Sequence, residues 1–190
     1  MISKVTQLNL NDQDAMVKYE KTLYRAFSDS DIQSLDLIWN MDHKARRIRT
    51  KVPYTNQEVF VLTFVGGTRF QAGLAVNFGM ENRLQLEMTG FKIGGSREHL
   101  CEALYLFSLA DSRMGEMILN ALGKSVFDRM RQKGIKVVYG TCSEKRLRQY
   151  MGIGFDKVDE RELKGERKYL LRMDVPQTFV PRKRLQLESQ

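Results

Sequence analysis

The sequence is poor in the residue types that hold metal ions and disulfide frameworks. Its 190 residues include two cysteines, two histidines and three prolines. Cys101 and Cys142 are too few and too far apart for a zinc site, and no secretory signal favours a disulfide between them. His43 and His99 lack metal-ligand spacing. We therefore expect no metal centre, and we expect both thiols to be small buried side chains.

Long apolar runs are also missing. No segment approaches the roughly 20 apolar residues that a membrane span needs, and residues 1–14 lack the apolar core of a signal peptide. These absences predict a cytoplasmic protein without a membrane span. The composition, 42% hydrophobic and 28% charged, is typical of a globular chain with a substantial core. We predict one domain at residues 1–175 and interpret residues 176–190 as a basic C-terminal tail.

Negative charge is outnumbered by positive charge, which gives a formal net charge of +8 at pH 7. Such a surface attracts nucleic acid, an acidic carrier protein or a phosphorylated cofactor. Part of the excess lies in two runs, residues 43–49 and 181–184, which a solvated helix end and a basic tail also explain. No aromatic residues alternate with these runs, so nucleic-acid binding is not favoured.

Hydrophobic periodicity predicts the secondary structure. The first half should contain a strand at residues 2–10, a helix at 11–27, a short helix at 29–39, and strands at 58–65, 68–78, 82–93 and 100–110. The strands between residues 58 and 93 read as an antiparallel meander. The strand at 100–110 is mostly apolar, as is typical of the middle of a sheet.

The second half begins with a long helix, which Ser112 can cap and which Gly134 can end. A strand at 135–142, a short helix at 144–151 and a last strand at 168–175 follow it. Because a strand, helix and strand in this order make a right-handed crossover, the strand at 135–142 should lie parallel to the one at 100–110. The pattern predicts a mixed α/β (α+β) fold.

The end of the short helix carries a recognisable motif. Tyr150 is followed by three residues and then by Gly154 and Phe155, directly after the strand at 135–142. This ending and the order of elements resemble the GNAT superfamily of N-acyltransferases. The resemblance implies a mostly antiparallel sheet of six to seven strands, splayed between its fourth and fifth strands and flanked by about four helices.

The resemblance also implies a donor, either acyl-CoA or acyl-phosphopantetheine, whose pantetheine arm enters the splay. The backbone of Phe107, Ser108 and Leu109 would bind the arm. The phosphates would bind at the start of the long helix, where free amides and the helix dipole favour an anion. The residues at that start are Ser112, Arg113, Met114, Gly115 and Glu116.

The phosphate-binding residues depart from the usual pattern of an Arg or Gln followed by two spaced glycines. Only Gly115 is present, and Glu116 would repel phosphate. A loop of this kind is found in the GNAT-like branch that takes acyl chains from acyl carrier protein, which includes acyl-homoserine lactone synthases and long-chain N-acyl amino acid synthases. That branch has a stretch like ELSRFAV, and this chain has EALYLFS, with Glu102 in the matching place and Tyr105 instead of arginine.

Acyl transfer to an amine needs a base for the amine, a polarised thioester carbonyl and an acid for the leaving thiolate. By family placement Tyr150 is the candidate acid, although a tyrosine packed on the core with its hydroxyl in water would look the same. Glu102 is the candidate base, because a carboxylate in an apolar strand is costly unless it is used or paired. It could equally reach solvent or pair with a lysine. Glu87 is the second candidate base.

The leading hypothesis is an N-acyltransferase that acts on a small amine. An acidic acyl carrier protein would suit the positive surface, and the candidates for its contact are Arg46, Arg47, Arg49 and Lys51. Two alternatives remain open. One is a catalytically inert GNAT-like binding module, and the other is an enzyme similar to the autoinducer or N-acyl amino acid synthases.

Overall fold

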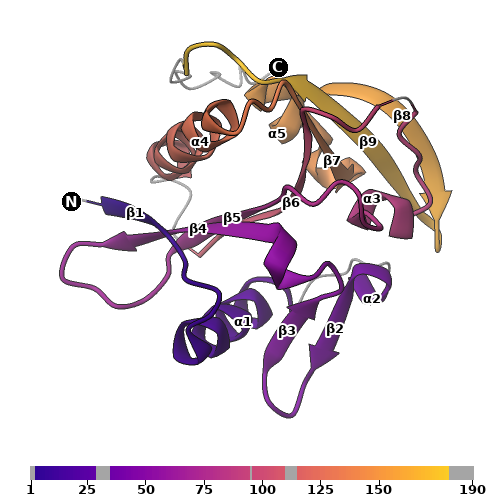
Figure 1. Ribbon diagram of the computed structural model, residues 1–190. Helices are drawn as coiled ribbons and strands as arrows, with labels where there is room; N and C mark the ends of the chain where they lie inside the picture. Colours follow the sequence, from indigo (N-terminus) through magenta and orange to yellow (C-terminus); the bar gives the residue numbers. More distant parts are fainter. Residues whose placement is uncertain (1–2, 29–34, 95, 110–114, 180–190) are drawn as a thin grey trace, which may run out of the picture.

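Figure 1 shows a computed structural model of the protein, which describes residues 3–28, 35–94, 96–109 and 115–179. Within these residues seven strands form one sheet, in the order β1 (Ser3–Gln7), β4 (Gln57–Phe64), β5 (Ala72–Asn77), β6 (Leu100–Ser108), β7 (Val137–Ser143), β9 (Glu166–Asp174) and β8 (Asp156–Leu163). Of the pairings described, β6 with β7 is parallel and the others in the sheet are antiparallel. The predicted mixed, mostly antiparallel sheet is confirmed.

A hairpin and five helices complete the described fold. The hairpin consists of β2 (Trp39–Asp42) and β3 (Arg47–Thr50), and a short 3₁₀ turn (Tyr54–Asn56) follows it. The helices are α1 (Gln13–Phe27), α2 (Leu35–Ile38), α3 (Gln85–Met88), α4 (Gly115–Gln132) and α5 (Glu144–Ile153). None of these helices is long and apolar enough to cross a membrane.

The helices cover the sheet on both faces. Figure 1 shows α4 and α5 on one face, and α1 with the β2–β3 hairpin on the other. Neighbouring residues of a strand therefore enter different cores: Phe60 and Leu62 pack under α4, while Val59 and Val61 pack under α1. The alternation of side chains in a strand explains this division. It also places β6, the fourth strand of the sheet, between the two layers.

Helix α1 follows from local signals in the sequence. The side chain of Asp12 accepts hydrogen bonds from the backbone amides of Asp14 (3.0 Å) and Ala15 (3.1 Å), which caps the first turn. Tyr19 and Leu23 are fully buried against the sheet. The predicted helix at 11–27 is thus confirmed to within two residues of its start.

Three segments differ from the prediction. Residues 82–93 form the short helix α3 and loops, not a strand, because Leu84, Leu86 and Phe91 are buried in a third core under β9. Residues 39–50 form the hairpin, so the basic run at 43–49 is not a helix end. β8 was not predicted, because its residues are nearly all polar and exposed. Residues 29–34 and 110–114, the start of two predicted helices, lie outside the described residues.

The C-terminal segment begins by packing on α4. The ring of Phe179 stacks on Phe127 with 5.8 Å between centroids, and it lies over Gly123, where a Cβ would approach the ring to 3.1 Å. Gly123 in mid-helix is explained by this contact. Residues 180–190 lie outside the described residues.

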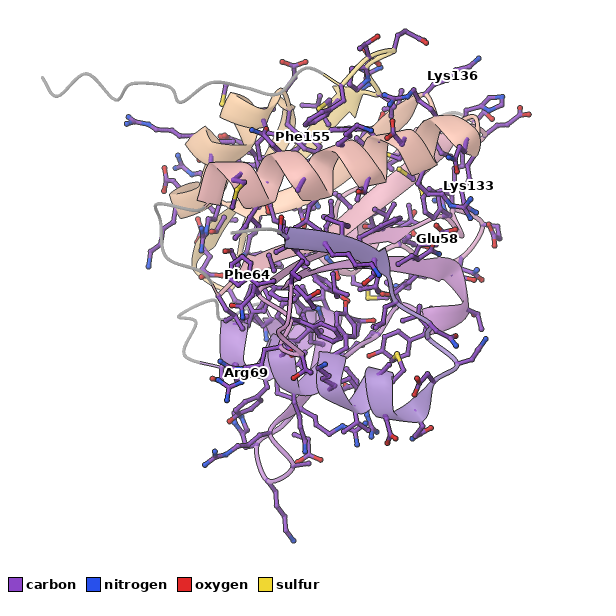
Figure 2. The ribbon with its side chains drawn as sticks, turned by 90° about the vertical axis from the view of Figure 1, so that its left-hand side faces the viewer. Glu58, Phe64, Arg69, Lys133, Lys136 and Phe155 are labelled. Carbon is purple, nitrogen blue, oxygen red and sulfur yellow. The ribbon has the colours of Figure 1, made fainter. Side chains whose placement is uncertain are left out.

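An ion-pair cluster ties α4 to the sheet (Figure 2). Arg129 donates two hydrogen bonds to the Glu58 carboxylate, at 2.7 and 2.8 Å, and Lys133 lies 3.0 Å from the same group. Burial alone would raise the pKa of Glu58, but the hydrogen bonds from Arg129 and Lys133 outweigh it and lower the pKa. The ionised form of the Glu58 side chain is therefore favoured more strongly in the folded chain than in the unfolded chain.

We predict that Glu58→Gln lowers the free energy of unfolding by about 1 kcal/mol at pH 7. Since the folded pKa is depressed, this stabilisation is present above the ordinary value of 4.5 and is lost as the pH falls below it. Urea denaturation of both proteins between pH 3 and pH 7 measures the difference. Glu162→Gln, on the exposed strand β8, is the matched control, and an equal loss in that variant would contradict the prediction.

Candidate active site

The sheet opens between its fourth and fifth strands. β6 and β7 pair only from Leu100 with Val137 to Ala103 with Gly140. Beyond that point β6 stays paired with β5 as far as Ser108, and β7 stays paired with β9 as far as Ser143. The two strands therefore part at about their middle. This confirms the predicted splay.

A β-bulge marks the place where the strands part. Ala75 pairs with Tyr105 and Val76 pairs with Ala103, so Leu104 is an extra residue in β6. A bulge bends the strand that carries it and increases the local twist. The carbonyl of Leu104 accepts a hydrogen bond from the Gln85 side chain at 2.8 Å. The bulge thus turns β6 away from β7 and is held from the side by the α3 segment.

The backbone direction beyond the bulge shows which residues face the opening. The amide of Leu109 donates to the carbonyl of Gln71 at 2.7 Å, so it points toward the β5 side. Alternate residues of a strand point their backbone groups to opposite sides. The backbone groups of Phe107 then point with those of Leu109, while those of Ser108 and Leu106 point toward the splay. Of the candidate donor-binding residues Ser108 has this direction, and Leu106 is an addition that the sequence did not indicate.

Tyr150 lies at the end of α5, as the motif predicts. Gly154 adopts a left-handed conformation with φ +112°, and its amide donates to the carbonyls of Met151 (3.0 Å) and Tyr150 (3.2 Å). This cap ends the helix, since glycine takes positive φ without a Cβ clash. Phe155 is then buried, and its ring packs edge-to-face with the ring of Tyr150, with 5.9 Å between centroids. The motif therefore fixes where the tyrosine ring lies.

The surroundings of Tyr150 keep its hydroxyl protonated. The ring packs against the core under α4, together with Leu106 of β6 and near Cys142 of β7. Burial, with a smaller contribution from Cys142, raises the pKa of Tyr150 to about 12. Cys142 lies two residues beyond the last pair between β6 and β7. Tyr150 is thus a protonated donor on the α4 side of the opened strands.

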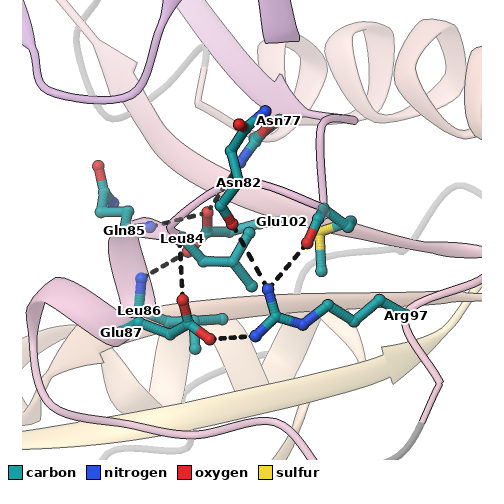
Figure 3. A network of polar contacts seen from close by, with 9 residues as sticks. Asn77, Asn82, Leu84, Gln85, Leu86, Glu87, Arg97 and Glu102 are labelled. Carbon is teal, nitrogen blue, oxygen red and sulfur yellow. Dashed lines mark hydrogen bonds and ion pairs between the residues drawn. The ribbon is translucent and has the colours of Figure 1, made fainter.

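Glu102 lies on the opposite side of β6, at the level of the last pairs with β7 (Figure 3). Its carboxylate accepts hydrogen bonds from the amides of Leu86 (2.6 Å) and Gln85 (3.1 Å) and from the side chain of Asn77 (3.3 Å). The side chain is buried, with 1% of the residue exposed. Glu102 is therefore shielded from solvent and has no lysine partner in the described part of the chain, and it anchors the first turn of α3 on the sheet.

Burial raises the pKa of Glu102 to about 7, although its hydrogen bonds act in the opposite direction. Glu87, the second candidate base, also raises it. Glu87 itself accepts from the amide of Leu84 at 3.2 Å and pairs with Arg97. Arg97 also donates to the carbonyl of Met80 at 2.9 Å, so this pair fastens the loops on either side of α3 (Figure 3).

The candidate phosphate site is only partly described. Ser112, Arg113 and Met114 lie outside the described residues, and for Gly115 and Glu116 the structure gives the helical backbone at the start of α4. Among the described residues no group of three or more His, Cys, Asp or Glu side chains could hold a metal ion.

A buried polar cluster on the α1 face was not anticipated. Tyr105, on β6 just after the bulge, shares a hydrogen bond with Tyr19 of α1. The neighbouring Glu20 is 3% exposed and accepts from Arg47 (2.6 Å) and Tyr54 (3.1 Å), with Arg49 3.4 Å away. The only sequence signal was an acidic residue beside the apolar face of α1.

This cluster changes the interpretation of the basic run. The charges of Arg47 and Arg49 are directed at Glu20, and the Lys51 ammonium donates to the carbonyl of Asp36 at 2.6 Å. Arg46 lies in the exposed turn of the hairpin with φ +52°. Of the four candidates for a carrier-protein contact, Arg46 therefore has its charge most clearly directed to solvent.

Solved structures with the same fold include acyltransferases of two kinds. The CoA-dependent acyl-homoserine lactone synthase BjaI, solved with SAM and isopentyl-CoA, matches 91% of this chain and 82% of its own with a TM-score of 0.68 and 13% identity. The acyl-homoserine lactone synthase LasI matches 92% of this chain and 90% of its own with a TM-score of 0.69 and 11% identity. The ribosomal-protein-S18-alanine N-acetyltransferase from Escherichia coli matches 93% and 96% with a TM-score of 0.57 and 10% identity.

The chain has the GNAT fold. The likeness rests on structure, because no protein-family model and no curated protein matches the sequence. The predicted GNAT-like architecture is thereby confirmed, and so is its particular similarity to the acyl-homoserine lactone synthases. The roles of Tyr150 and Glu102 within this GNAT fold are proposals, developed below.

We predict that the buried carboxyl of Glu102 makes stability depend on pH. Its folded pKa of about 7 lies above the ordinary value of 4.5, so the protonated form is favoured in the folded chain. Relative to Glu102→Gln, the free energy of unfolding of the native protein should fall by about 3 kcal/mol as the pH rises from 4.5 through 7, and should be level above about pH 8.

Urea denaturation at pH 4.5, 5.5, 6.5 and 7.5 tests this prediction, with Glu162→Gln as the control for loss of an exposed carboxylate. A difference between native protein and Glu102→Gln that does not change with pH would contradict it, because the carboxyl would then titrate alike in the folded and unfolded chains.

Proposed function

We propose that the protein is an N-acyltransferase that moves an acyl group from a pantetheine thioester to an amine. The observation that carries the proposal is the splay between β6 and β7, with a protonated tyrosine on one side of it. An open interior edge leaves strand backbone groups without a partner, and an extended amide-containing arm can pair with them as an added strand would. The pantetheine arm has this character.

In the proposed reaction the arm lies along β6 and pairs with backbone groups of Ser108 and Leu106. The same backbone holds the thioester carbonyl, on which negative charge develops during attack. The amine nitrogen forms the new bond to the acyl carbon, and the carbon–sulfur bond breaks. Tyr150 gives its proton to the departing thiolate.

The amine must lose a proton before or during the attack, and Glu102 is the proposed acceptor. A carboxyl with a pKa of about 7 is poised to take a proton at neutral pH. Its three hydrogen bonds occupy three of about four lone-pair sites, which leaves one for a water molecule. Since Glu102 is 1% exposed, it would act through water rather than touch the acceptor. Glu87, more exposed but paired with Arg97, is the second candidate.

The likeness to BjaI and LasI favours an autoinducer-synthase-like enzyme as the more specific form of this proposal. Their TM-scores of 0.68 and 0.69 exceed the 0.57 of the E. coli N-acetyltransferase. BjaI is CoA-dependent, so acyl-CoA is the first donor to test, and acyl carrier protein is the second. We expect a soluble cytoplasmic enzyme. A catalytically inert binding module remains the competing proposal.

The test of the donor class is a binding screen. Thermal shift and native mass spectrometry should show stabilisation by acetyl-CoA, a medium-chain acyl-CoA or an acylated carrier protein. Failure of all three to bind would remove the support for an acyltransferase. Binding without thiol release, in the presence of SAM and a panel of amino acids and amines, would favour the inert module.

We predict that Tyr150→Phe lowers kcat by about 10²-fold or more with little change in the KM for the donor, because the ring contacts remain and only the acid is lost. Thiol release from the best donor measures the rate. In the native protein the pKa of about 12 keeps Tyr150 from causing a falling limb between pH 6 and pH 10.

The matched control is Tyr24→Phe, which removes a hydroxyl of α1 that shares a hydrogen bond of 3.1 Å with His43, on the other face of the sheet. An unchanged turnover rate in Tyr150→Phe at several pH values would remove Tyr150 from the chemistry. A loss of equal size in both variants would point to a general effect of losing a tyrosine hydroxyl.

A further inference from the structure

A cavity of 310 Å³ lies between α1 and the turn that joins β4 to β5. Three cationic side chains come from one face of α1 and one from the turn, and a single carboxylate faces them. The residues that carry the argument are Lys18, Lys21, Arg25, Arg69, Phe70 and Asp14. The lining therefore has a net charge of +3, concentrated in one concave site.

Three of the four cations of this cavity have no acidic partner within the described residues, and unlike the scattered exposed residues Lys4, Lys44 and Lys136 they line one concave site. Among the described residues, Lys21, Arg25 and Arg69 form no ion pair or side-chain hydrogen bond. By contrast, Glu58, Asp128 and Glu20 each bind two basic residues within the same described part of the chain. Lys21, Arg25 and Arg69 are all exposed to solvent, so their mutual repulsion is screened, and an anion bound in this open cavity would reduce it further.

The side chain of Lys18 lines the cavity and is held in place by two contacts with the turn between β4 and β5. Its ammonium donates to the carbonyl of Thr68 and lies 4.4 Å from the centre of the Phe70 ring. These contacts join α1 to the turn between β4 and β5. The two sides of the cavity are thus tied together, and the positive groups of α1 and of Arg69 are kept facing the same space.

The cavity lies at the end of the sheet where a donor would enter the splay. Residue 69 is two positions before Gln71, whose carbonyl binds the amide of Leu109 at the end of β6. β6 is the strand whose outer half is unpaired on the β7 side. Figure 2 shows Arg69 on the α1 side of the sheet, below Phe64 at the end of β4. A group bound at the cavity is close to the open end of β6.

We propose that this cavity binds a phosphate group of the acyl donor. The inference rests on the proposed function for the identity of the ligand, but the anion site itself can be measured without any reaction. The start of α4 offers Gly115 as its single glycine and adds the acidic Glu116. Arg113, just before it in the sequence, adds a positive charge, but Glu116 offsets it, so a donor with phosphates would gain from further positive charge, and the α1 cavity carries a net charge of +3. The phosphate is either the 3′-phosphate of CoA or the phosphate that joins pantetheine to its carrier.

Calorimetry with the full-length protein tests the site. The probes are inorganic phosphate, adenosine 3′,5′-bisphosphate, CoA, dephospho-CoA and phosphopantetheine. The variant is Lys21→Gln with Arg25→Gln and Arg69→Gln. The control carries Lys4→Gln, Lys44→Gln and Lys136→Gln, which remove the same net charge from exposed positions outside the cavity. Circular dichroism and urea denaturation confirm that both proteins fold.

The cavity variant should bind adenosine 3′,5′-bisphosphate and CoA about tenfold more weakly or worse, and the control within about twofold of the native protein. If the 3′-phosphate occupies the cavity, the native protein prefers CoA to dephospho-CoA and the variant loses that preference. If the pantetheine phosphate occupies it, the variant loses affinity for phosphopantetheine and for both CoA forms alike.

Equal losses in the cavity variant and the control would overturn the proposal, since they would show attraction by net charge only. So would unchanged binding of every probe in the cavity variant, or no binding of any phosphate probe to the native protein. These outcomes are separable from failure of the acyltransfer proposal: phosphate binding that depends on the cavity, with no thiol release from any thioester, retains the anion site and rejects the enzyme.

Discussion

The parting of β6 from β7 is the constraint on which the rest of the structure depends. Each strand keeps its outer neighbour to the end, β5 in one case and β9 in the other, so the opening is not a frayed edge but a gap inside an otherwise continuous sheet. Buried backbone groups without partners are costly. A gap of this kind persists because the bulge at Leu104 directs β6 away and because the freed groups are left for water or a ligand.

Glu102 stabilises the region of the sheet where β6 and β7 separate. It pairs in register with Tyr139, one position before the last pair, and its carboxylate holds the backbone of residues 85 and 86 against β6. A buried carboxylate is costly unless hydrogen bonds replace its hydration. Three hydrogen bonds replace some of the hydration that the Glu102 carboxylate loses on burial. The loss that they do not replace raises the pKa to about 7. A single group thus links the stability of the α3 segment to pH in the range where a general base would work.

Local signals in the sequence predicted the elements that depend on local physics. Asp12 caps α1, and Gly154 ends α5 by adopting a φ that other residues avoid. The prediction of a strand at residues 82–93 was wrong because the conformation of this segment depends on a residue distant in the sequence. Leu84 and Leu86 alternate as in a strand, but both are buried around the start of a helix whose amides bind Glu102, a residue 16 positions from Leu86. No pattern within the segment could reveal that partner.

The same distinction holds for the candidate site. Tyr150 could be placed from its motif because the motif is the helix end itself. The Glu20 cluster could not be placed, because its partners come from β3 and from the turn after it, and the apolar alternation of β2 and β3 extends over only four residues in each strand. The cations of the α1 cavity share one helix face at three- and four-residue spacing, but Arg69 joins them only through the fold of the β4–β5 turn. The spacing of the basic residues along α1 is equally typical of a helix face exposed to solvent, so the sequence alone does not indicate the cavity.

In the proposed reaction, the protonation of the leaving group depends on the burial of Tyr150. A phenol with a pKa of about 12 is a poor acid for a thiolate in water, whose pKa is about 8.5, because complete transfer would be uphill by about 5 kcal/mol. Burial also raises the pKa of the neighbouring Cys142 thiol, to about 11. In the proposed reaction, a pantetheine thiolate released beside it would meet the same loss of hydration, and its pKa would rise toward that of the phenol. The desolvation that weakens Tyr150 as an acid strengthens the thiolate as a base, and the proton can pass between them with little difference in free energy.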